Sequence, residues 1–288
     1  MLAGSVEVWD LGMNARLEKK IAVVTGAGRG IGKELATLIA SEGAKVIVND
    51  LDPETVTKTV TEIKQLGLQC SGFPGDVTKQ NFAQDLADFT RDQFGDVHII
   101  VNNAGYVWND RIHHVSDEQW DAMHDIHLKA PFQILRAFYP LIAEQVSEER
   151  KSGRPQSRKI INISSISATR GAAGQSPYSA AKAGLFGLTK SLAKEWGHMN
   201  VTVNCVAFGL VDTRLTKTAN SQTDTIDLDG RKMNVGFTTE QKDSIVKSIP
   251  LGYSASPKMA AGGAFILSLP EADYITGQCF EIAGGIIY

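Results

Sequence analysis

The sequence of 288 residues has few cysteines, no long apolar run and no large excess of charge of either sign. Its three cysteines, Cys70, Cys205 and Cys279, are odd in number, far apart and inside apolar runs. This usage is typical of reduced, buried thiols in a cytoplasmic protein and argues against a disulfide framework or a metal site. No apolar run approaches the ~20 residues that a membrane-spanning helix needs. A net charge of −3 and a pI near 6.1 give no footprint for nucleic acid.

The first residues, MLAGSVEVWDLG, carry acids and no basic leader, so they do not resemble a signal peptide. Met13 opens a second plausible start, which makes residues 1–12 an extension or an alternative beginning. We predict an N-terminal extension over 1–17 and a single domain over 18–288, since no repeat or second boundary is visible. The 43% hydrophobic content is ordinary for a globular protein, and the length suffices for a large core.

Short apolar runs alternate with helical patterns along the chain, which predicts an α/β fold. Wholly apolar strands are expected where helices cover both faces of a parallel sheet. The alternation indicates a single-domain, doubly wound parallel sheet with helices on both faces. The expected strands are 20–25, 44–49, 68–73, 97–101, 159–163, 201–206 and 277–282, and the expected helix starts are Lys33, Asp52-Pro53, Thr78, Ser116, Ser179 and Ser256-Pro257.

Four connecting segments carry further expectations. Residues 106–115 are rich in aromatic and histidine side chains without metal-ligand spacing, so they predict the lip of a pocket. Residues 116–146 read as one long helix that its two prolines interrupt. The charged run 147–158 is typical of an exposed, mobile insertion. Residues 207–250 are long and polar, which favours a substrate loop or lid.

A glycine-rich turn, Gly26–Gly32 (GAGRGIG), follows the first strand directly and opens a helix. Glycines there let the backbone approach a diphosphate, which rests on the helix N-terminus. The spacing differs from the G-x-G-x-x-G fingerprint, so a turn that binds nothing stays open as an alternative. Asp50, about 20 residues beyond the glycines, can accept the ribose hydroxyls of NAD and repels the 2′-phosphate of NADP. Arg29 can pair with that phosphate, so NAD is favoured and NADP is the alternative.

The stretch from Ser164 to Lys182 carries the candidate catalytic groups. Tyr178 and Lys182 are four apart, which places them on one face of a helix. A free phenol titrates near ~10, and an ammonium within about 4–6 Å moves its pKa toward the working range. Ser165 ends the preceding strand, where its hydroxyl can bond a substrate oxygen shared with the tyrosine. A lone Y-x-x-x-K also occurs by chance on many helices, so the assignment depends on the rest of the chain.

The motifs T-G-A-G-R-G-I-G at 25–32, N-N-A-G at 102–105, Ser165 and Tyr178-x-x-x-Lys182 occur in this order. Together they resemble the short-chain dehydrogenase/reductase family over roughly residues 18 to 285. The resemblance implies a sheet of about seven strands, an NAD(P) cofactor and a homotetramer or homodimer joined through two long helices. It also implies that Tyr178 is the general acid/base, that Ser165 polarises the carbonyl, and that Lys182 lowers the tyrosine pKa and binds the nicotinamide ribose. The matching cofactor positions are Gly26, Arg29, Gly30, Ile31, Gly32, Asp50, Asp76, Val77, Asn103, Ala104, Gly105, Tyr178, Lys182, Val211 and Thr213.

Two positions depart from the family pattern. His127 stands where an asparagine usually anchors a relay water, and Phe208-Gly209 replaces the usual Pro-Gly beside the nicotinamide. A histidine at the first position resembles a subgroup that acts on 3-hydroxyacyl and 3-oxoacyl thioesters. We expect His127 either to hold the relay water and titrate near neutrality as a fourth catalytic residue, or to be a packed helix histidine bonded to a backbone carbonyl.

The predicted function is hydride transfer between NAD and a secondary alcohol or ketone, on a small-molecule substrate of the 3-hydroxyacyl/3-oxoacyl-CoA thioester type. A free cyclic or aromatic secondary alcohol is the alternative substrate. A non-catalytic subunit of a larger complex is the alternative from another class, but it would typically have lost Ser165, Tyr178 or Lys182, and all three are present. A sugar-nucleotide epimerase would need a larger substrate domain than 288 residues allow.

Overall fold

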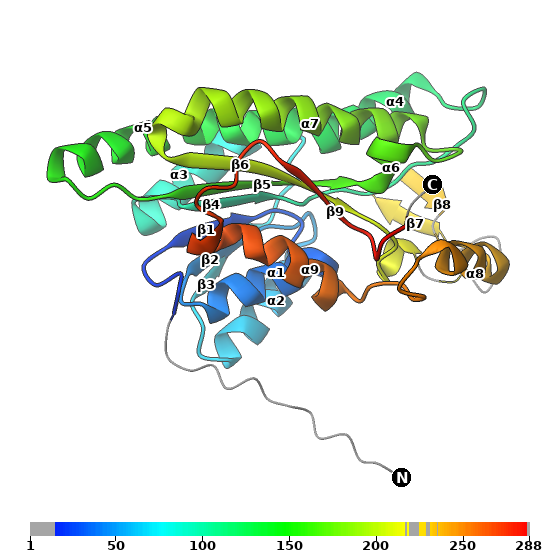
Figure 1. Ribbon diagram of the computed structural model, residues 1–288, viewed down its shortest axis with the longest axis horizontal. Helices are drawn as coiled ribbons and strands as arrows, with labels where there is room; N and C mark the ends of the chain where they lie inside the picture. Colours follow the sequence, from blue (N-terminus) through cyan, green and yellow to red (C-terminus); the bar gives the residue numbers. More distant parts are fainter. Residues whose placement is uncertain (1–14, 217, 219–224, 229–230, 235, 287–288) are drawn as a thin grey trace, which may run out of the picture.

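The computed structural model describes residues 15–216, 218, 225–228, 231–234 and 236–286. Within them, seven strands form one parallel sheet in the order β3-β2-β1-β4-β5-β6-β9 (Figure 1). The strand order reverses between β1 and β4, which confirms the predicted doubly wound sheet. The strands are β1 Ile21–Val24, β2 Lys45–Val48, β3 Cys70–Gly72, β4 Ile99–Asn102, β5 Arg158–Ser165, β6 Val201–Phe208 and β9 Cys279–Ile282.

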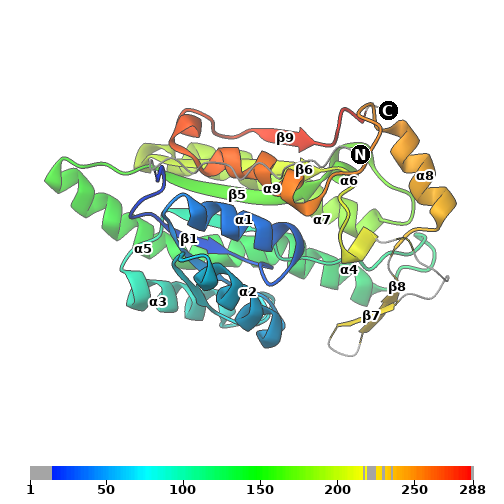
Figure 2. The ribbon, with the colours of Figure 1, turned by 90° about the horizontal axis from the view of Figure 1, so that it is seen from below.

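Helices cover both faces of the sheet, so each face has its own core (Figures 1 and 2). Strand β1 contributes to both, because Ala22 and Val24 pack on one side and Val23 on the other. This two-sided burial explains why the strands are continuous apolar runs. One layer holds α1 Gly30–Ser41, α2 Pro53–Gln65 and α9 Pro257–Phe265, and the other holds α3 Phe82–Phe94, α4 Asp117–His124, α5 Ala130–Ser152 and α7 Ser176–Trp196.

Asp52, Ser116 and Ser256 cap helices as expected, whereas α1 and α7 begin at Gly30 and Ser176, ahead of the expected Lys33 and Ser179 and without a side-chain cap. Asp52 accepts the Glu54 N–H at 3.0 Å and so begins α2, and Ser256 likewise begins α9. The expected cap at Thr78 is wrong, because α3 begins at Phe82. The Thr78 hydroxyl instead donates to the Asp76 carboxylate at 2.7 Å, which closes a turn ahead of the helix.

The long helix of the second layer is not interrupted at its prolines, contrary to the expectation. Helix α4 continues through a π-helical turn, Asp125–Lys129, directly into α5. In that turn the Ala130 N–H bonds the Asp125 carbonyl five residues back. Pro131 follows at once, where the hydrogen-bond ladder is already displaced, and Pro140 lies within α5.

The charged run 147–158 is exposed over most of its length, as expected, but it is not a separate insertion, because its first half continues a helix. Helix α5 extends to Ser152, and Arg158 begins β5 with only 1% of its surface exposed. The Arg158 guanidinium bonds the carboxylates of Asp96 and Glu149 at 3.0 and 2.8 Å. Glu149 and Arg158 are therefore paired within the fold, which a run of sequence letters does not reveal.

Much of the segment expected as a long loop has structure of its own. It contains an antiparallel hairpin, β7 Thr225–Leu228 with β8 Arg231–Asn234, and the helix α8 Thr239–Ser248. Thr238 and Gln241 form a capping box at the start of α8, a signal that the sequence analysis missed. These elements lie beside the carboxyl ends of the strands (Figure 2).

At the other end of the chain, most of the expected extension 1–17 lies outside the described residues, which begin at 15. Leu17 is buried in the core, and its N–H bonds the Glu42 carbonyl at 2.8 Å. Within the described residues no helix combines the length and apolar character that crossing a membrane requires.

Candidate active site

One cavity of about 1750 Å³ lies at the carboxyl ends of the strands, beside the point where the strand order reverses. This is where doubly wound sheets bind their ligands. The cavity is larger than the ~300–1,000 Å³ of ordinary ligand pockets, so it has room for a dinucleotide and a second molecule. Every candidate site residue lines it: Gly26, Arg29, Gly30, Ile31, Gly32, Asp50, Asp76, Val77, Asn103, Ala104, Gly105, His127, Ser165, Tyr178, Lys182, Val211 and Thr213.

The glycine-rich turn is a cradle that side chains would fill. Gly26 has a φ of +62°, and a Cβ there would lie 2.7 Å from the Ala104 Cα. A Cβ on Gly32 would collide with the carbonyl of Gly26. Asn103 holds the turn in place, because its side-chain amide donates to the carbonyls of Thr25 and Gly26 at 2.9 Å. A bare backbone at the N-terminus of α1 is what a diphosphate requires, so these residues fit a dinucleotide.

Two carboxylates, Asp50 and Asp52, lie at the end of the cavity beyond the glycine turn. The Asp50 carboxylate accepts the Gly28 N–H at 2.9 Å through Oδ2. The Arg29 guanidinium pairs with Asp52 at 2.9 Å. Arg214, from the segment after β6, also faces this end, where burial and the charge of Arg29 lower its pKa. Arg29 is thus already bonded to a carboxylate of the same pocket.

Ser165, Tyr178 and Lys182 meet at the end of β5. The Lys182 ammonium donates to the Ile163 carbonyl at 2.6 Å and lies 5.9 Å from the centre of the Tyr178 ring. The Ser164 hydroxyl donates to the Lys182 carbonyl at 2.9 Å, which ties α7 to the strand. Ser165 lies close enough to Tyr178 to act on the pKa of its phenol. The fold thus places a phenol, a hydroxyl and an ammonium around one position.

The protonation states of this group follow from burial. Burial raises the pKa of Tyr178, and Ser165 opposes that change only in part. This direction is opposite to the expected lowering by Lys182. Burial also lowers the pKa of Lys182 to about 8, so the lysine is close to its titration point near neutral pH. A phenol that keeps its proton and a lysine that shares its proton readily can act as a proton donor and its relay.

His127 lies in the π-helical turn with 2% of its surface exposed. Its Nε2 is 2.7 Å from the Tyr106 carbonyl, and since a carbonyl only accepts, Nε2 carries the proton. Its Nδ1 is buried and has no hydrogen-bond partner among the described residues. The imidazole meets the Tyr178 ring edge-on, at 4.9 Å and 89°. Gly105 packs against the imidazole so closely that a Cβ would collide with it.

The expectation that His127 titrates near neutrality is wrong. Burial, with the charge of Lys182 as a further cause, lowers its pKa well below the usual 6.5. If His127 is a packed helix histidine, one ring nitrogen should bond a backbone carbonyl, and Nε2 does so with the carbonyl of Tyr106. The other ring nitrogen, Nδ1, has a lone pair and no hydrogen-bond partner among the described residues, so the imidazole can accept one further hydrogen bond.

Several cavity residues were not identified from the sequence. On the substrate side, Lys242 of α8 pairs with Asp212 at 2.7 Å, and the Ser254 hydroxyl donates to the same carboxylate at 2.6 Å. Asp125, in the π-helical turn, and Arg170 of α6 Ile166–Arg170 line the cavity as well. Polar residues of this kind carry no spacing signal, because contacts between distant segments bring them together. Of the expected pocket lip 106–115, Tyr106, Val107 and Asn109 line the cavity.

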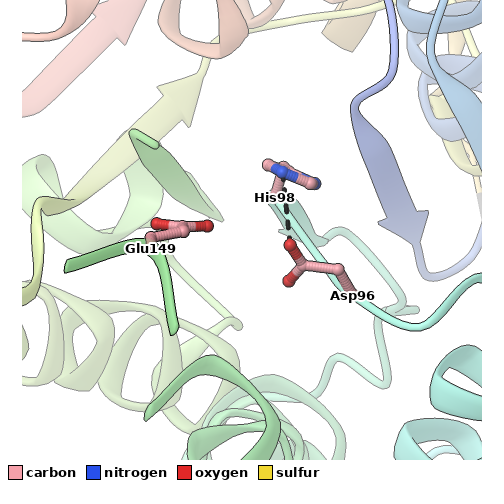
Figure 3. Close-up of side chains that lie close together, drawn as sticks. All are labelled: Asp96, His98 and Glu149. Atoms are coloured by element: carbon pink, nitrogen blue, oxygen red, sulfur yellow. Dashed lines mark ion pairs between the residues drawn. The ribbon is translucent and has the colours of Figure 1, made fainter. Parts of the chain in front are cut away.

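A second cluster of titratable groups lies at the opposite ends of the strands. The ligand atoms of Asp96, His98 and Glu149 lie within 4.8 Å of one another, as a metal site would require (Figure 3). Both carboxylates, however, are bonded to the Arg158 guanidinium, and Nδ1 of His98 accepts the Ile21 N–H at 3.3 Å. The cation that balances these acids is thus an arginine, and the cluster ties β1, β4, β5 and α5 together.

A dinucleotide cradle next to a serine, tyrosine and lysine that share one position defines an NAD(P)-dependent oxidoreductase. Comparison with known proteins then identifies the family: the chain belongs to the short-chain dehydrogenases, whose family description "short chain dehydrogenase" matches residues 20–224.

Individual relatives extend this similarity over nearly the whole chain. It is 34% identical to the 3-oxoacyl-[acyl-carrier-protein] reductase FabG of Vibrio cholerae, over 94% of this chain and 98% of that protein. It is 30% identical to the protein of the same description from Thermotoga maritima, over 94% and 99%. It is also 31% identical to the (2S)-[(R)-hydroxy(phenyl)methyl]succinyl-CoA dehydrogenase subunit BbsD of Thauera aromatica, over 93% and 97%.

Proposed function

We propose that this protein transfers a hydride between NAD and a 3-hydroxyacyl/3-oxoacyl thioester, with coenzyme A as the thiol component. The observation that carries the proposal is the meeting of Ser165, Tyr178 and Lys182 in one cavity with the glycine cradle. The thioester is supported by the relatives, whose descriptions name an acyl carrier protein or coenzyme A. Three free thiols among the described residues are in keeping with a reducing compartment such as the cytoplasm.

The bound dinucleotide supplies the hydride chemistry at its nicotinamide. In the reducing direction, the Tyr178 hydroxyl donates a proton to the substrate oxygen as the hydride arrives, and Ser165 bonds the same oxygen and steadies it. The Lys182 ammonium, held by the Ile163 carbonyl, provides the next proton and stabilises the phenolate that remains. In the oxidising direction the same groups act in reverse.

We further propose that His127 completes the proton path to solvent as a positioning residue. Its Nδ1 can accept a hydrogen bond from a water molecule, as the usual asparagine would through its side-chain oxygen. The tautomer is fixed by the Tyr106 carbonyl, so the lone pair on Nδ1 stays available. Because the pKa of His127 is lowered, the imidazole is neutral across the physiological range and accepts throughout it.

We propose NAD rather than NADP as the cofactor because of the charged side chains beyond the glycine turn. A 2′-phosphate would meet the Asp50 carboxylate, whose Oδ2 is bonded to the Gly28 N–H. Arg29, which could offset that repulsion, is paired with Asp52. The two acids therefore work together, one by repelling the phosphate and the other by occupying the arginine.

Assembly is proposed through the second helix layer. Phe132 and Tyr139 of α5 and Trp120 of α4 are large apolar side chains that remain exposed on it. An exposed apolar set of this kind on two long helices is in keeping with a homotetramer or homodimer.

Two alternatives have specific support. The substrate named for the relative from Thauera aromatica is a CoA thioester that carries a phenyl group beside its hydroxyl group, which favours an aromatic secondary alcohol in thioester form. The same protein is described as a subunit, which favours a role within a larger complex. The retention of Ser165, Tyr178 and Lys182 weighs against a non-catalytic subunit.

The deciding experiment measures oxidation and reduction rates over a panel of substrates with each cofactor. The panel contains 3-hydroxyacyl-CoA and 3-oxoacyl-CoA esters, the matching acyl carrier protein thioesters, and free cyclic and aromatic alcohols. We expect the highest kcat/KM with the CoA esters and NAD(H). Higher kcat/KM for free alcohols would refute the thioester, and activity that survives in Tyr178→Phe would refute the site itself.

A further inference from the structure

Two of the three free thiols lie side by side on the sheet, although they are far apart in the chain. Cys205 of β6 and Cys279 of β9 are direct partners in the parallel register. Neighbouring strands lie about 4.7–4.9 Å apart, within the Cα separation of about 4.4–6.8 Å that a disulfide spans. Register partners project toward the same face of the sheet, and each of the two thiols shifts the pKa of the other. The two side chains therefore lie next to each other on one face.

The two thiols differ in access and in acidity. Cys205 is fully buried, whereas Cys279 is partly exposed on β9, the last strand at its edge of the sheet. The interaction with Cys205, with a further effect of the Lys190 charge, lowers the pKa of Cys279. The same interaction and burial raise the pKa of Cys205. An accessible, more acidic thiol next to a second thiol is the arrangement of cysteines that react with oxidants.

We propose that Cys205 and Cys279 form an oxidative modification site whose co-substrate is a hydroperoxide. The Cys279 thiolate attacks one oxygen of hydrogen peroxide, the O–O bond breaks, and a sulfenic acid forms as one water leaves. The Cys205 thiol then attacks the Cys279 sulfur, the S–O bond breaks, and a second water leaves. Two thiols lose two electrons in total, and the peroxide gains them.

The disulfide would form directly behind the candidate catalytic groups. Ser164 is among the groups that influence the pKa of Cys205, and its hydroxyl donates to the Lys182 carbonyl at 2.9 Å. Cys205 also interacts electrostatically with Lys182 itself. Forming the disulfide removes the Cys205 proton and fixes the positions of the two side chains, so it changes the surroundings of Lys182. The effect on turnover rests on the proposed function, whereas formation of the disulfide does not.

The test treats the full-length, reduced protein with a small molar excess of hydrogen peroxide and maps its peptides by mass spectrometry without reduction. We expect a disulfide between Cys205 and Cys279 within one chain, a free Cys70, and full reversal by dithiothreitol. Cys70→Ser is the matched control, since Cys70 is buried without a cysteine partner in the register, and it should form the same disulfide. Cys205→Ser should stop at a sulfenic acid on Cys279 that dimedone traps.

Three results would overturn the proposal: three thiols that stay free, direct conversion of Cys279 to a sulfinic acid, or a disulfide between two copies. For turnover, we expect kcat to fall at least about tenfold on oxidation, since a displacement of ~1 Å can cost up to 10²-fold. Reduction should restore it, and Cys279→Ser should be insensitive to peroxide. A disulfide without loss of turnover would overturn the link to Lys182, whereas a reduced protein without any activity would overturn the proposed function instead.

Discussion

Replacing His127 by leucine removes a buried acceptor from a side chain that packs against the Tyr178 ring. Leucine fills a similar volume but offers no lone pair where Nδ1 stands without a partner. If that lone pair holds the relay water, the kcat of His127→Leu should fall by at least ~10²-fold, the scale of losing one proton-transfer step. His127→Asn should keep much of the activity, because an amide oxygen also accepts.

The same replacement has a separate effect on stability that must be accounted for. Leucine removes the donor that now lies 2.7 Å from the Tyr106 carbonyl, and the loss of one hydrogen bond costs about 0.5–1.5 kcal/mol. Unfolding curves in urea therefore accompany the kinetics, and NADH affinity is measured by fluorescence. A purely structural role would lower stability and cofactor affinity together, while a relay role lowers kcat and leaves NADH affinity unchanged.

The pH profile separates the two roles further. Because the folded-state pKa of His127 is well below 6.5, the imidazole gains a proton only in acid, and there it loses its lone pair. The acidic limb of alcohol oxidation should therefore lie below pH 6.5 in the native protein and be absent in His127→Asn. A leucine variant that folds normally and turns over at nearly the native rate would show that His127 is only packing.

Three further predictions concern single residues. Tyr178→Phe should lower kcat by at least ~10²-fold with NADH affinity nearly unchanged, and a variant that keeps more than about a tenth of native kcat contradicts the assignment. Asp52→Asn removes the ion-pair partner of Arg29 and should raise kcat/KM for NADP while leaving that for NAD unchanged. Because both side chains of the pair are about two-fifths exposed, the gain should be at most about fivefold. Equal use of both cofactors by the native protein would refute the NAD preference. His98 is buried with a pKa lowered from 6.5 to about 3. Below pH 6.5 the unfolded chain therefore binds a proton at this residue that the folded chain does not bind. Lowering the pH from 7 to 5 should reduce the free energy of unfolding by about 2 kcal/mol through His98. A His98→Gln variant whose stability has the same pH dependence as the native protein would contradict this.

Local signals in the sequence determined much of the fold. A carboxylate followed by proline at Asp52-Pro53 begins a helix wherever it stands, because the capping bond and the restricted φ act within one turn. The apolar runs became parallel strands because both of their faces are covered. The order of the glycine turn, the N-N-A-G motif and Tyr178-x-x-x-Lys182 was enough to predict the family, and the residues of the cavity followed from it.

What only the tertiary structure decided depends on distant contacts and on burial. Arg158 stands in a charged run, yet Asp96, more than sixty positions away, turns it into a buried ion pair. Cys205 and Cys279 look unrelated until the register of β6 and β9 sets them opposite each other. Burial moved the pKa of His127 and Tyr178 in directions that their spacing did not indicate. The cost of desolvating a charge is a property of everything packed around it, and no short stretch of sequence contains that information.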